Sequence, residues 1–150
     1  MNARLHLKCE IEHGYGSGYA SYIDAWFYPA KGGSPARRYG DSECREGLVI
    51  LFSILSDYYA IGQGERCKSV SGSGGSHYLP DLMMIDKVTD PHLQYLVPKI
   101  EKVLDQEFCL KRIGATTLSE SIPSHLRHHD TTNLSNPPYH VFDALFYWYD

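Results

Sequence analysis

The sequence predicts an α+β fold: an antiparallel sheet of about four to six strands with two main helices packed on one face. Three observations support this prediction. Polar and apolar residues alternate near the N-terminus, as is typical of strands. Two longer segments are apolar in ways that favour helices, and an apolar, aromatic segment closes the chain. The 150 residues fit one domain spanning 1–150, and a hydrophobic fraction of 43% is enough for one core.

The N-terminal part is predicted to form a hairpin. Apolar and polar residues alternate through residues 3–12, as in a half-buried strand. A glycine-rich turn follows at residues 13–18, and residues 19–28 form the second strand. One face of that strand is expected to carry Tyr22, Asp24, Trp26 and Tyr28, and the other face Ile23, Ala25 and Phe27. Pro29 ends the strand, and an exposed loop follows.

The first main helix is expected over residues 41–61. Asp41 and Ser42 offer side-chain oxygens that can cap its N-terminus, and Gly62 can stop it. Residues 48–55 are apolar almost all round, so we expect this helix to be covered on more than one side. A Gly/Ser-rich segment then reaches residue 75 and can hold a short strand at 66–70, and residues 78–88 are predicted to form another strand.

The second main helix begins at Asp90-Pro91, a capping residue followed by proline at the first helical position. Its apolar residues recur at three- and four-residue spacing and are Leu93, Leu96, Val97, Ile100, Val103, Leu104 and Phe108. Pro98 lies inside this pattern, so it either kinks the helix or marks a new first turn. Gly114 follows as a stop signal.

The C-terminal part is predicted to contain a short strand at 116–122, a long polar loop at 123–138 and a strand over Tyr139–Tyr149. In that last strand, Phe142 and Phe146 would belong to the core, and Asp143, Tyr147 and Tyr149 to the opposite face. An apolar strand left on a sheet edge invites pairing with another chain. One hypothesis is therefore a structural or homodimeric subunit that pairs through this C-terminal strand.

Charge and cysteine content restrict the partners. A net charge of −4 argues against nucleic acid or an anionic membrane as the main partner. The apolar run at 48–55 is far too short to span a bilayer. The cysteines at 9, 44, 67 and 109 form no CxxC pair, and the N-terminus has no apolar signal core. Two disulfides are arithmetically possible, but we expect reduced cysteines and a cytoplasmic protein, with Cys44 the best placed for a lowered thiolate pKa.

One cluster suggests metal chemistry. His125, His128, His129 and Asp130 place imidazoles three residues apart beside a carboxylate, so they can ligate a transition metal. The corresponding hypothesis is a metal-dependent hydrolase. We favour the simpler interpretation of an exposed polar loop, because no matching ligands on distant helices can be named. No cofactor is expected.

The favoured hypothesis is a binding protein that inhibits or sequesters another protein. Twelve Tyr and two Trp are many for this length, and aromatic side chains carry much of the binding energy at protein interfaces. A small acidic protein without a catalytic motif resembles, as a class, the bacterial immunity proteins that neutralise a toxin, commonly a basic one. The expected partner-binding residues are Asp24, Trp26, Tyr28, Asp143, Tyr147 and Tyr149.

Overall fold

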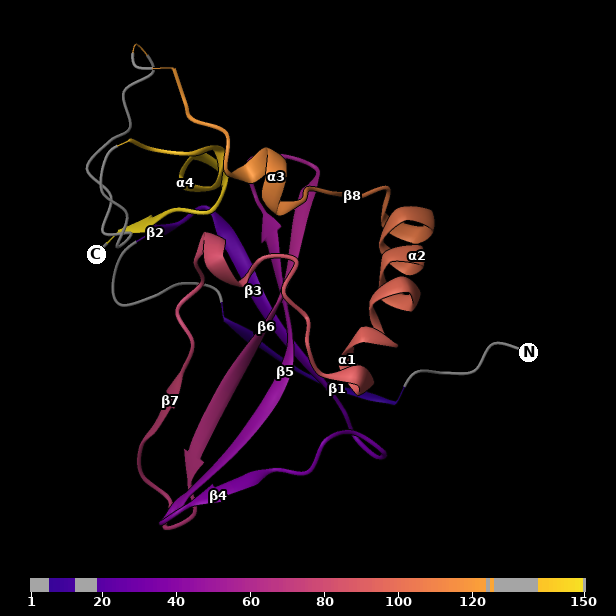
Figure 1. Ribbon diagram of the computed structural model, residues 1–150, viewed down its shortest axis with the longest axis vertical. Coiled ribbons are helices and arrows are strands. Elements are labelled where there is room, and N and C mark those ends of the chain that lie inside the picture. The colour runs from indigo at the N-terminus through magenta and orange to yellow at the C-terminus, as the bar shows by residue number, and fades with distance from the viewer. Residues whose placement is uncertain (1–5, 13–18, 124, 126–137, 150) are drawn as a thin grey trace.

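The computed structural model describes residues 6–12, 19–123, 125 and 138–149, and it has a curled sheet with helices on both faces, which confirms the α+β class (Figure 1). The main path of the sheet runs in the order β1-β3-β5-β6-β7. These strands are β1 (Leu7–Glu12), β3 (Tyr22–Pro29), β5 (Ser42–Ser53), β6 (Tyr58–Ser69) and β7 (Gly75–His77). In addition, β4 (Arg37–Tyr39) pairs with β5, and β8 (Lys111–Arg112) pairs in parallel with β6.

The predicted N-terminal strands pair as expected. β1 and β3 are antiparallel, in a register that runs from Leu7 opposite Pro29 to Glu12 opposite Asp24. The second strand is interrupted at Ser21, and β2 (Tyr19–Ala20) pairs instead with β9 (Trp148–Tyr149). The interruption has a local cause: the Ser21 N–H donates to the Tyr147 carbonyl at 2.8 Å and its Oγ donates to the Leu145 carbonyl at 2.9 Å. The Ser21 N–H is therefore satisfied by the C-terminal segment, and the Ser21 carbonyl accepts a hydrogen bond from the Ile54 N–H at 2.9 Å.

The helix expected over residues 41–61 is absent, and the segment forms most of a long hairpin. β5 and β6 pair from Ser42 opposite Ser69 to Phe52 opposite Tyr59. The prediction is wrong because a short run that is apolar on all sides also suits a strand buried on both faces. Leu48 and Val49 are both fully buried, yet they point to opposite sides of the sheet. The prediction of two main helices is therefore not confirmed.

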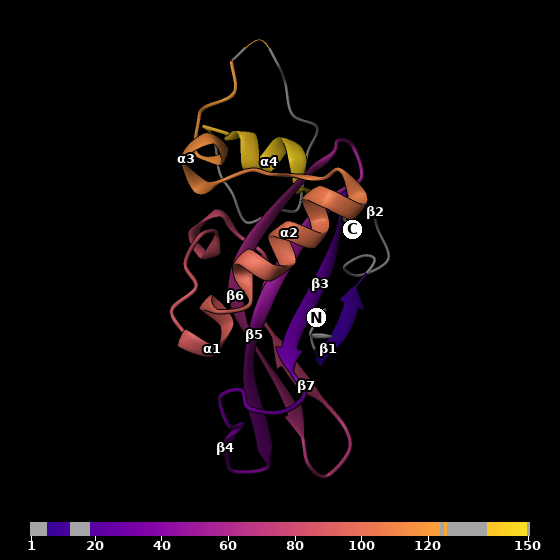
Figure 2. The same cartoon turned by 90° about the vertical axis from the view of Figure 1, so that its right-hand side faces the viewer.

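The helix predicted after Asp90 is present in two pieces. α1 (Pro91–Gln94) begins at Asp90, whose side chain accepts a hydrogen bond from the His92 N–H at 2.8 Å. α2 (Val97–Phe108) has Pro98 in its first turn, so this proline starts a new helix rather than kinking one. Figure 2 shows α2 running across the sheet, with α1 below it.

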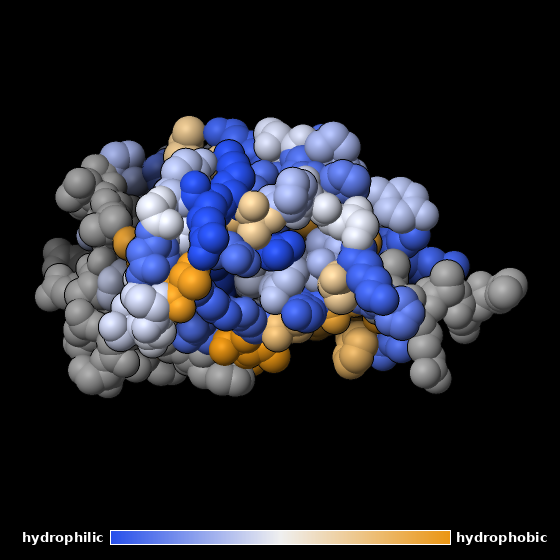
Figure 3. All heavy atoms as spheres, turned by 90° about the horizontal axis from the view of Figure 1, so that it is seen from below, coloured by the Kyte–Doolittle hydropathy of each residue, from blue (hydrophilic) through white to orange (hydrophobic). Residues whose placement is uncertain are grey.

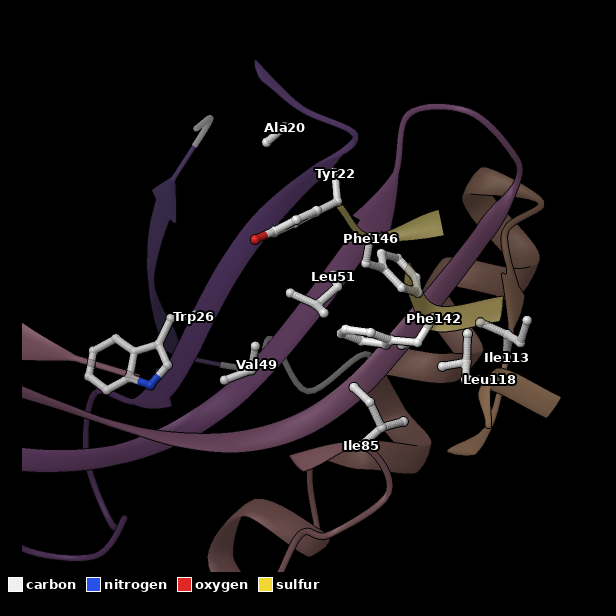
Figure 4. Close-up of a cluster of buried hydrophobic side chains, with 11 residues drawn as sticks. Ala20, Tyr22, Trp26, Val49, Leu51, Ile85, Ile113, Leu118, Phe142 and Phe146 are labelled. Carbon is white, nitrogen blue, oxygen red and sulfur yellow. The ribbon is translucent and has the colours of Figure 1, made fainter. Parts of the chain in front are cut away.

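Two layers of side chains enclose the sheet. On the face that we call the α2 face, Leu48, Ile50, Tyr59 and Ile61 pack against the apolar residues of α1 and α2. On the opposite face, called the α4 face, Val49 and Leu51 pack with residues from three short helices and their flanks (Figure 4). These helices are η1 (Leu82–Met84), α3 (Ala115–Leu118) and α4 (Val141–Leu145). Both faces of β5 and β6 are thus buried at the centre of the molecule.

The last segment differs from the predicted strand. Residues 141–145 form α4, and only Trp148 and Tyr149 are in a strand. Phe142 and Phe146 lie one helical turn apart, with ring centroids separated by 5.5 Å, and both are buried. Their four-residue spacing is a helical signal within an otherwise strand-like composition. The strands expected at 78–88 and 116–122 are likewise replaced by η1 and α3, with single bridges at Ile85 and Ser121.

A disulfide joins the two central strands. Cys44 of β5 lies opposite Cys67 of β6, their Cα atoms are 4.0 Å apart, and their sulfurs are bonded. The expectation of reduced cysteines is therefore corrected for this pair, and Cys44, expected in the first turn of a helix, lies in a strand and has no free thiol. Cys9 and Cys109 are free thiols. No helix within the described ranges has the length and apolar character needed to cross a membrane.

Candidate binding site

Glycines in β5 and β6 let two aromatic side chains approach the backbone on the α4 face. A Cβ atom at Gly47 would overlap the Trp26 indole, and one at Gly64 would overlap the Tyr78 ring. Trp26 fixes its position further by donating from Nε1 to the Gly64 carbonyl at 3.0 Å. Both rings therefore lie against the strands in a trough that any larger residue would fill.

A buried polar network lies beside these rings. Asp24 is 0% exposed and accepts a hydrogen bond from the Tyr78 hydroxyl at 2.8 Å. Arg66, 7% exposed, donates from Nη2 to the same hydroxyl at 3.1 Å, and this nitrogen is 3.8 Å from Asp24 Oδ2. Burial and the Asp24 charge raise the pKa of Tyr78 far above its ordinary value, so its hydroxyl stays protonated and can donate.

The network continues to the surface through β1. Arg66 Nη1 donates to Glu10 Oε2 at 3.3 Å, and Lys68 Nζ donates to Glu10 Oε1 at 2.6 Å. Burial alone would raise the pKa of Glu10, but Lys68 and Arg66 outweigh it and hold that pKa below its ordinary value. Arg66 also lies 5.3 Å from the centroids of the Trp26 and Tyr78 rings. These contacts join β1, β3 and β6 through their side chains, and we call this network the base of the site.

A hollow of about 370 Å³ opens above this base. Tyr28 is its most prominent ring: the centroid lies 4.7 Å from that of Trp26, 5.1 Å from Arg45 Cζ and 5.9 Å from Lys8 Nζ. Basic side chains outnumber acidic ones in the lining, with Lys8, Arg45, Arg66 and Lys68 against Glu10 and Glu43. On the face seen from below, hydrophilic residues cover most of the coloured surface and hydrophobic ones form separate patches (Figure 3). The hollow thus offers an aromatic ring between two cations.

The predicted partner-binding residues fall into two separate groups. Trp26 and Tyr28 line the hollow with their rings in contact, whereas the buried Asp24 lies outside the lining and is joined to it through Arg66. Asp143, 3% exposed, accepts a hydrogen bond from the His140 N–H at 2.7 Å and so caps α4. Tyr147 follows α4, and Tyr149 belongs to β9. Figure 4 shows Trp26 far along β3 from Phe142 and Phe146, so the two groups do not form one patch.

Several residues of the site escaped the sequence analysis. Arg66 and Lys68 belong to a Gly/Ser-rich stretch in which only a short strand at 66–70 was expected, and Tyr78 begins the strand expected at 78–88. A signal was present, because Gly64, Arg66 and Lys68 alternate with Glu65 and Cys67 in the pattern of a strand. The helix assigned up to residue 61 removed the neighbouring strand on which that signal depends.

The other potential sites have less chemistry to offer. A larger hollow of about 600 Å³ lies between the loop after β3 and α1, where its lining is mainly apolar and includes Pro29, Tyr95 and Lys99. Among the described residues, potential metal ligands gather only at Cys44, Glu65 and Cys67, and the two sulfurs are joined in the disulfide. Of the predicted metal cluster, His125 is exposed, and His128, His129 and Asp130 lie outside the described residues.

No protein-family model matches the chain, and no curated protein and no solved structure matches it either. Its function must therefore be argued from the site itself.

Proposed function

We propose that this chain is a binding protein that inhibits or sequesters another protein, as bacterial immunity proteins do, and that the Tyr28 hollow is the centre of its binding surface. The observation that carries the proposal is the setting of Tyr28. Tyrosine and arginine are among the residue types that dominate binding energy at interfaces, and here Arg45 and Lys8 both flank the Tyr28 ring.

The buried network supports this role by preorganising the surface. Trp26 is held by its hydrogen bond to Gly64, and Arg66 by Tyr78, Asp24 and Glu10. A ring that is already fixed loses little conformational entropy when a partner covers it, so more of the contact energy appears as affinity. The buried residues below are fixed and the hollow above them is open, so a partner can reach Tyr28 and Arg45.

The charge of the hollow refines the expected partner. The chain as a whole is acidic, which suits a basic partner such as a toxin. Locally, however, Lys8 and Arg45 flank Tyr28, so the group inserted here would be an acidic side chain or a carboxylate. A partner of either net charge meets this requirement if it presents one such group beside an apolar contact.

The disulfide bears on where this binding would take place. A cytoplasmic protein was expected, but disulfides persist mainly in oxidising compartments, so Cys44–Cys67 weighs against that location. Alkylation of the protein directly in the source cell, followed by mass spectrometry, would show whether both cysteines are protected as a disulfide.

A pair of matched variants tests the proposal. In the site variant, Tyr28→Ala and Arg45→Glu remove the ring and reverse one of its cations. In the control, Tyr95→Ala and Lys99→Glu do the same to an exposed pair in which Lys99 Nζ lies 3.7 Å from the Tyr95 ring centroid. Both proteins, with the wild type, serve as baits for capture from the source cell with quantitative mass spectrometry.

The expected result is a partner that the wild type and the control retain in equal amount and that the site variant loses at least tenfold. Such a loss corresponds to about 1.4 kcal/mol of binding free energy, which is less than the loss of one interface hot spot causes. Capture that is equal for all three baits would refute the site. Capture lost only by the control would move the binding surface to the α1 side.

A further inference from the structure

The sheet ends in a strand whose outer edge faces no described segment. β1 pairs with β3 on one side and lies at the end of the strand order. Figure 2 shows β1 at the margin of the sheet, on the side of β3 away from β5. Cys9 is exposed and Ile11 is 53% exposed, so apolar groups accompany the open edge. Open edges of this kind are templates for pairing with another strand.

The hydrogen bonds to β3 determine which residues of β1 present their backbone outward. The Ala30 N–H donates to the His6 carbonyl at 2.9 Å, and these two residues lie opposite each other if the register of β1 and β3 is extended by one pair. Hydrogen-bonded pairs alternate with non-hydrogen-bonded pairs in an antiparallel ladder, so the even-numbered residues of β1 bond to β3. Pro29, which lacks an N–H, accordingly lies opposite odd-numbered Leu7. The N–H and C=O groups of Leu7, Cys9 and Ile11 therefore point away from the sheet.

These outward groups restrict how a second copy of β1 could pair antiparallel with the first. Residues with outward groups must lie opposite one another, and the best register uses all three in each copy. That register places Cys9 opposite its own counterpart and Leu7 opposite Ile11 of the second copy, with two hydrogen bonds in each opposed pair. A shift by two residues in either direction leaves one outward-facing residue of each β1 with no residue of the other β1 opposite it.

Side-chain charges select the same register. With Cys9 on the two-fold axis, Lys8 lies opposite Glu10 of the second copy, and the apolar side chains of Leu7 and Ile11 share the opposite face. A shift by two residues in one direction would oppose Lys8 with Lys8, and in the other direction Glu10 with Glu10. Like charges directly opposite each other are destabilising, so only one register satisfies both the backbone and the side chains.

We propose that the outer edge of β1 is a homodimer interface, at which two copies pair antiparallel about Cys9 to form one continuous sheet. The interface is isologous, because each copy supplies both the lysine and the glutamate. It shares Lys8 and Glu10 with the lining of the Tyr28 hollow, but it does not depend on the function proposed for that hollow. The two-fold axis would leave the α4 faces of both copies on the same side of the joined sheet.

Cysteine cross-linking tests the register. The Cα atoms of a hydrogen-bonded antiparallel pair lie about 5.5 Å apart, within the range for a disulfide. With Cys109→Ser to remove the other free thiol, the oxidant diamide should convert the protein to a dimer that dithiothreitol reverses. Moving the thiol with Cys9→Ser and Leu7→Cys should abolish the cross-link, and adding Ile11→Cys to that variant should restore it. Equal cross-linking at residues 7 and 9 would overturn the proposed register.

Sedimentation equilibrium under reducing conditions tests the interface itself. Lys8→Glu places glutamates opposite each other twice in the dimer, so we expect the dimer dissociation constant to rise about tenfold or more. Lys99→Glu makes the same change of charge on α2 and should leave the constant unchanged. A wild-type protein that stays monomeric up to about 1 mM would refute the proposal, and so would equal effects of the two substitutions. Equal partner capture by all three baits, together with a dimeric wild type, would refute only the function proposed for the hollow.

Discussion

Replacing Tyr78 by Phe removes one oxygen from the centre of the buried network and leaves the ring that covers Gly64 in place. That hydroxyl donates to Asp24 at 2.8 Å and accepts from Arg66 at 3.1 Å. Asp24 is 0% exposed, so water cannot replace the lost donor. Hydrogen bonds to charged groups contribute about 1.5–3 kcal/mol each. Because Arg66 keeps its contact with Glu10, we expect a loss of about 2–3 kcal/mol in the free energy of unfolding.

Urea unfolding followed by tryptophan fluorescence measures this loss, since Trp26 lies within the same layer. For a domain of this size each kcal/mol corresponds to about 2–4 °C, so the melting temperature should fall by about 4–12 °C. Tyr39→Phe is the matched control, because this tyrosine is 57% exposed and outside the network. A Tyr78→Phe protein within about 0.5 kcal/mol of the wild type would show that the network does not stabilise the fold.

Three further changes probe the same region. Reduction of the Cys44–Cys67 disulfide, which closes a sequence separation of 23, should cost about 3 kcal/mol, measured by thermal melting with and without reductant; a Cys44→Ala/Cys67→Ala variant should melt at one temperature in both conditions. Gly64→Ala should cost about 1–3 kcal/mol, because its Cβ overlaps the Tyr78 ring, and in a Tyr78→Ala background the added cost should largely vanish. The folded pKa of Glu10 lies below its unfolded value near 4.5, so its stabilising contribution is present above that value and is lost as the pH falls through the folded pKa. Glu10→Gln should therefore flatten the decline of melting temperature in acid, and an unchanged decline would contradict the assigned ion pairs.

The parts of the fold that were predicted correctly each have a single clear period. β1 alternates polar and apolar residues, and the segment after Asp90 repeats them at helical spacing with a proline at each new first turn. Residues 48–55 have no period, because both faces of β5 are buried, and a helix and a strand are then equally consistent with the pattern. The C-terminal segment failed differently: its composition favours a strand, but packing of Phe142 and Phe146 into the core favours a helical turn.

The candidate site was only partly predictable for a related reason. Asp24, Trp26 and Tyr28 share a face by simple alternation, so their grouping followed from the strand. Tyr78 contacts Asp24 across a sequence separation of 54, and nothing local specifies that contact. Gly64 shows the same limit: glycine suggests a flexible segment, whereas here it makes room for a ring.

The position of the last described segment has a consequence for how the chain acquires its structure during synthesis. Phe146 packs edge-on against Tyr22 with centroids 6.2 Å apart, and Ser21 bonds to the backbone of residues 145 and 147. The first strands of the chain therefore complete their contacts only after residues more than a hundred positions later have been synthesised. A ribosome-bound chain whose residue 146 is still in the exit tunnel would leave part of the α4 face uncovered, and exposed apolar surface of this kind favours association with other chains.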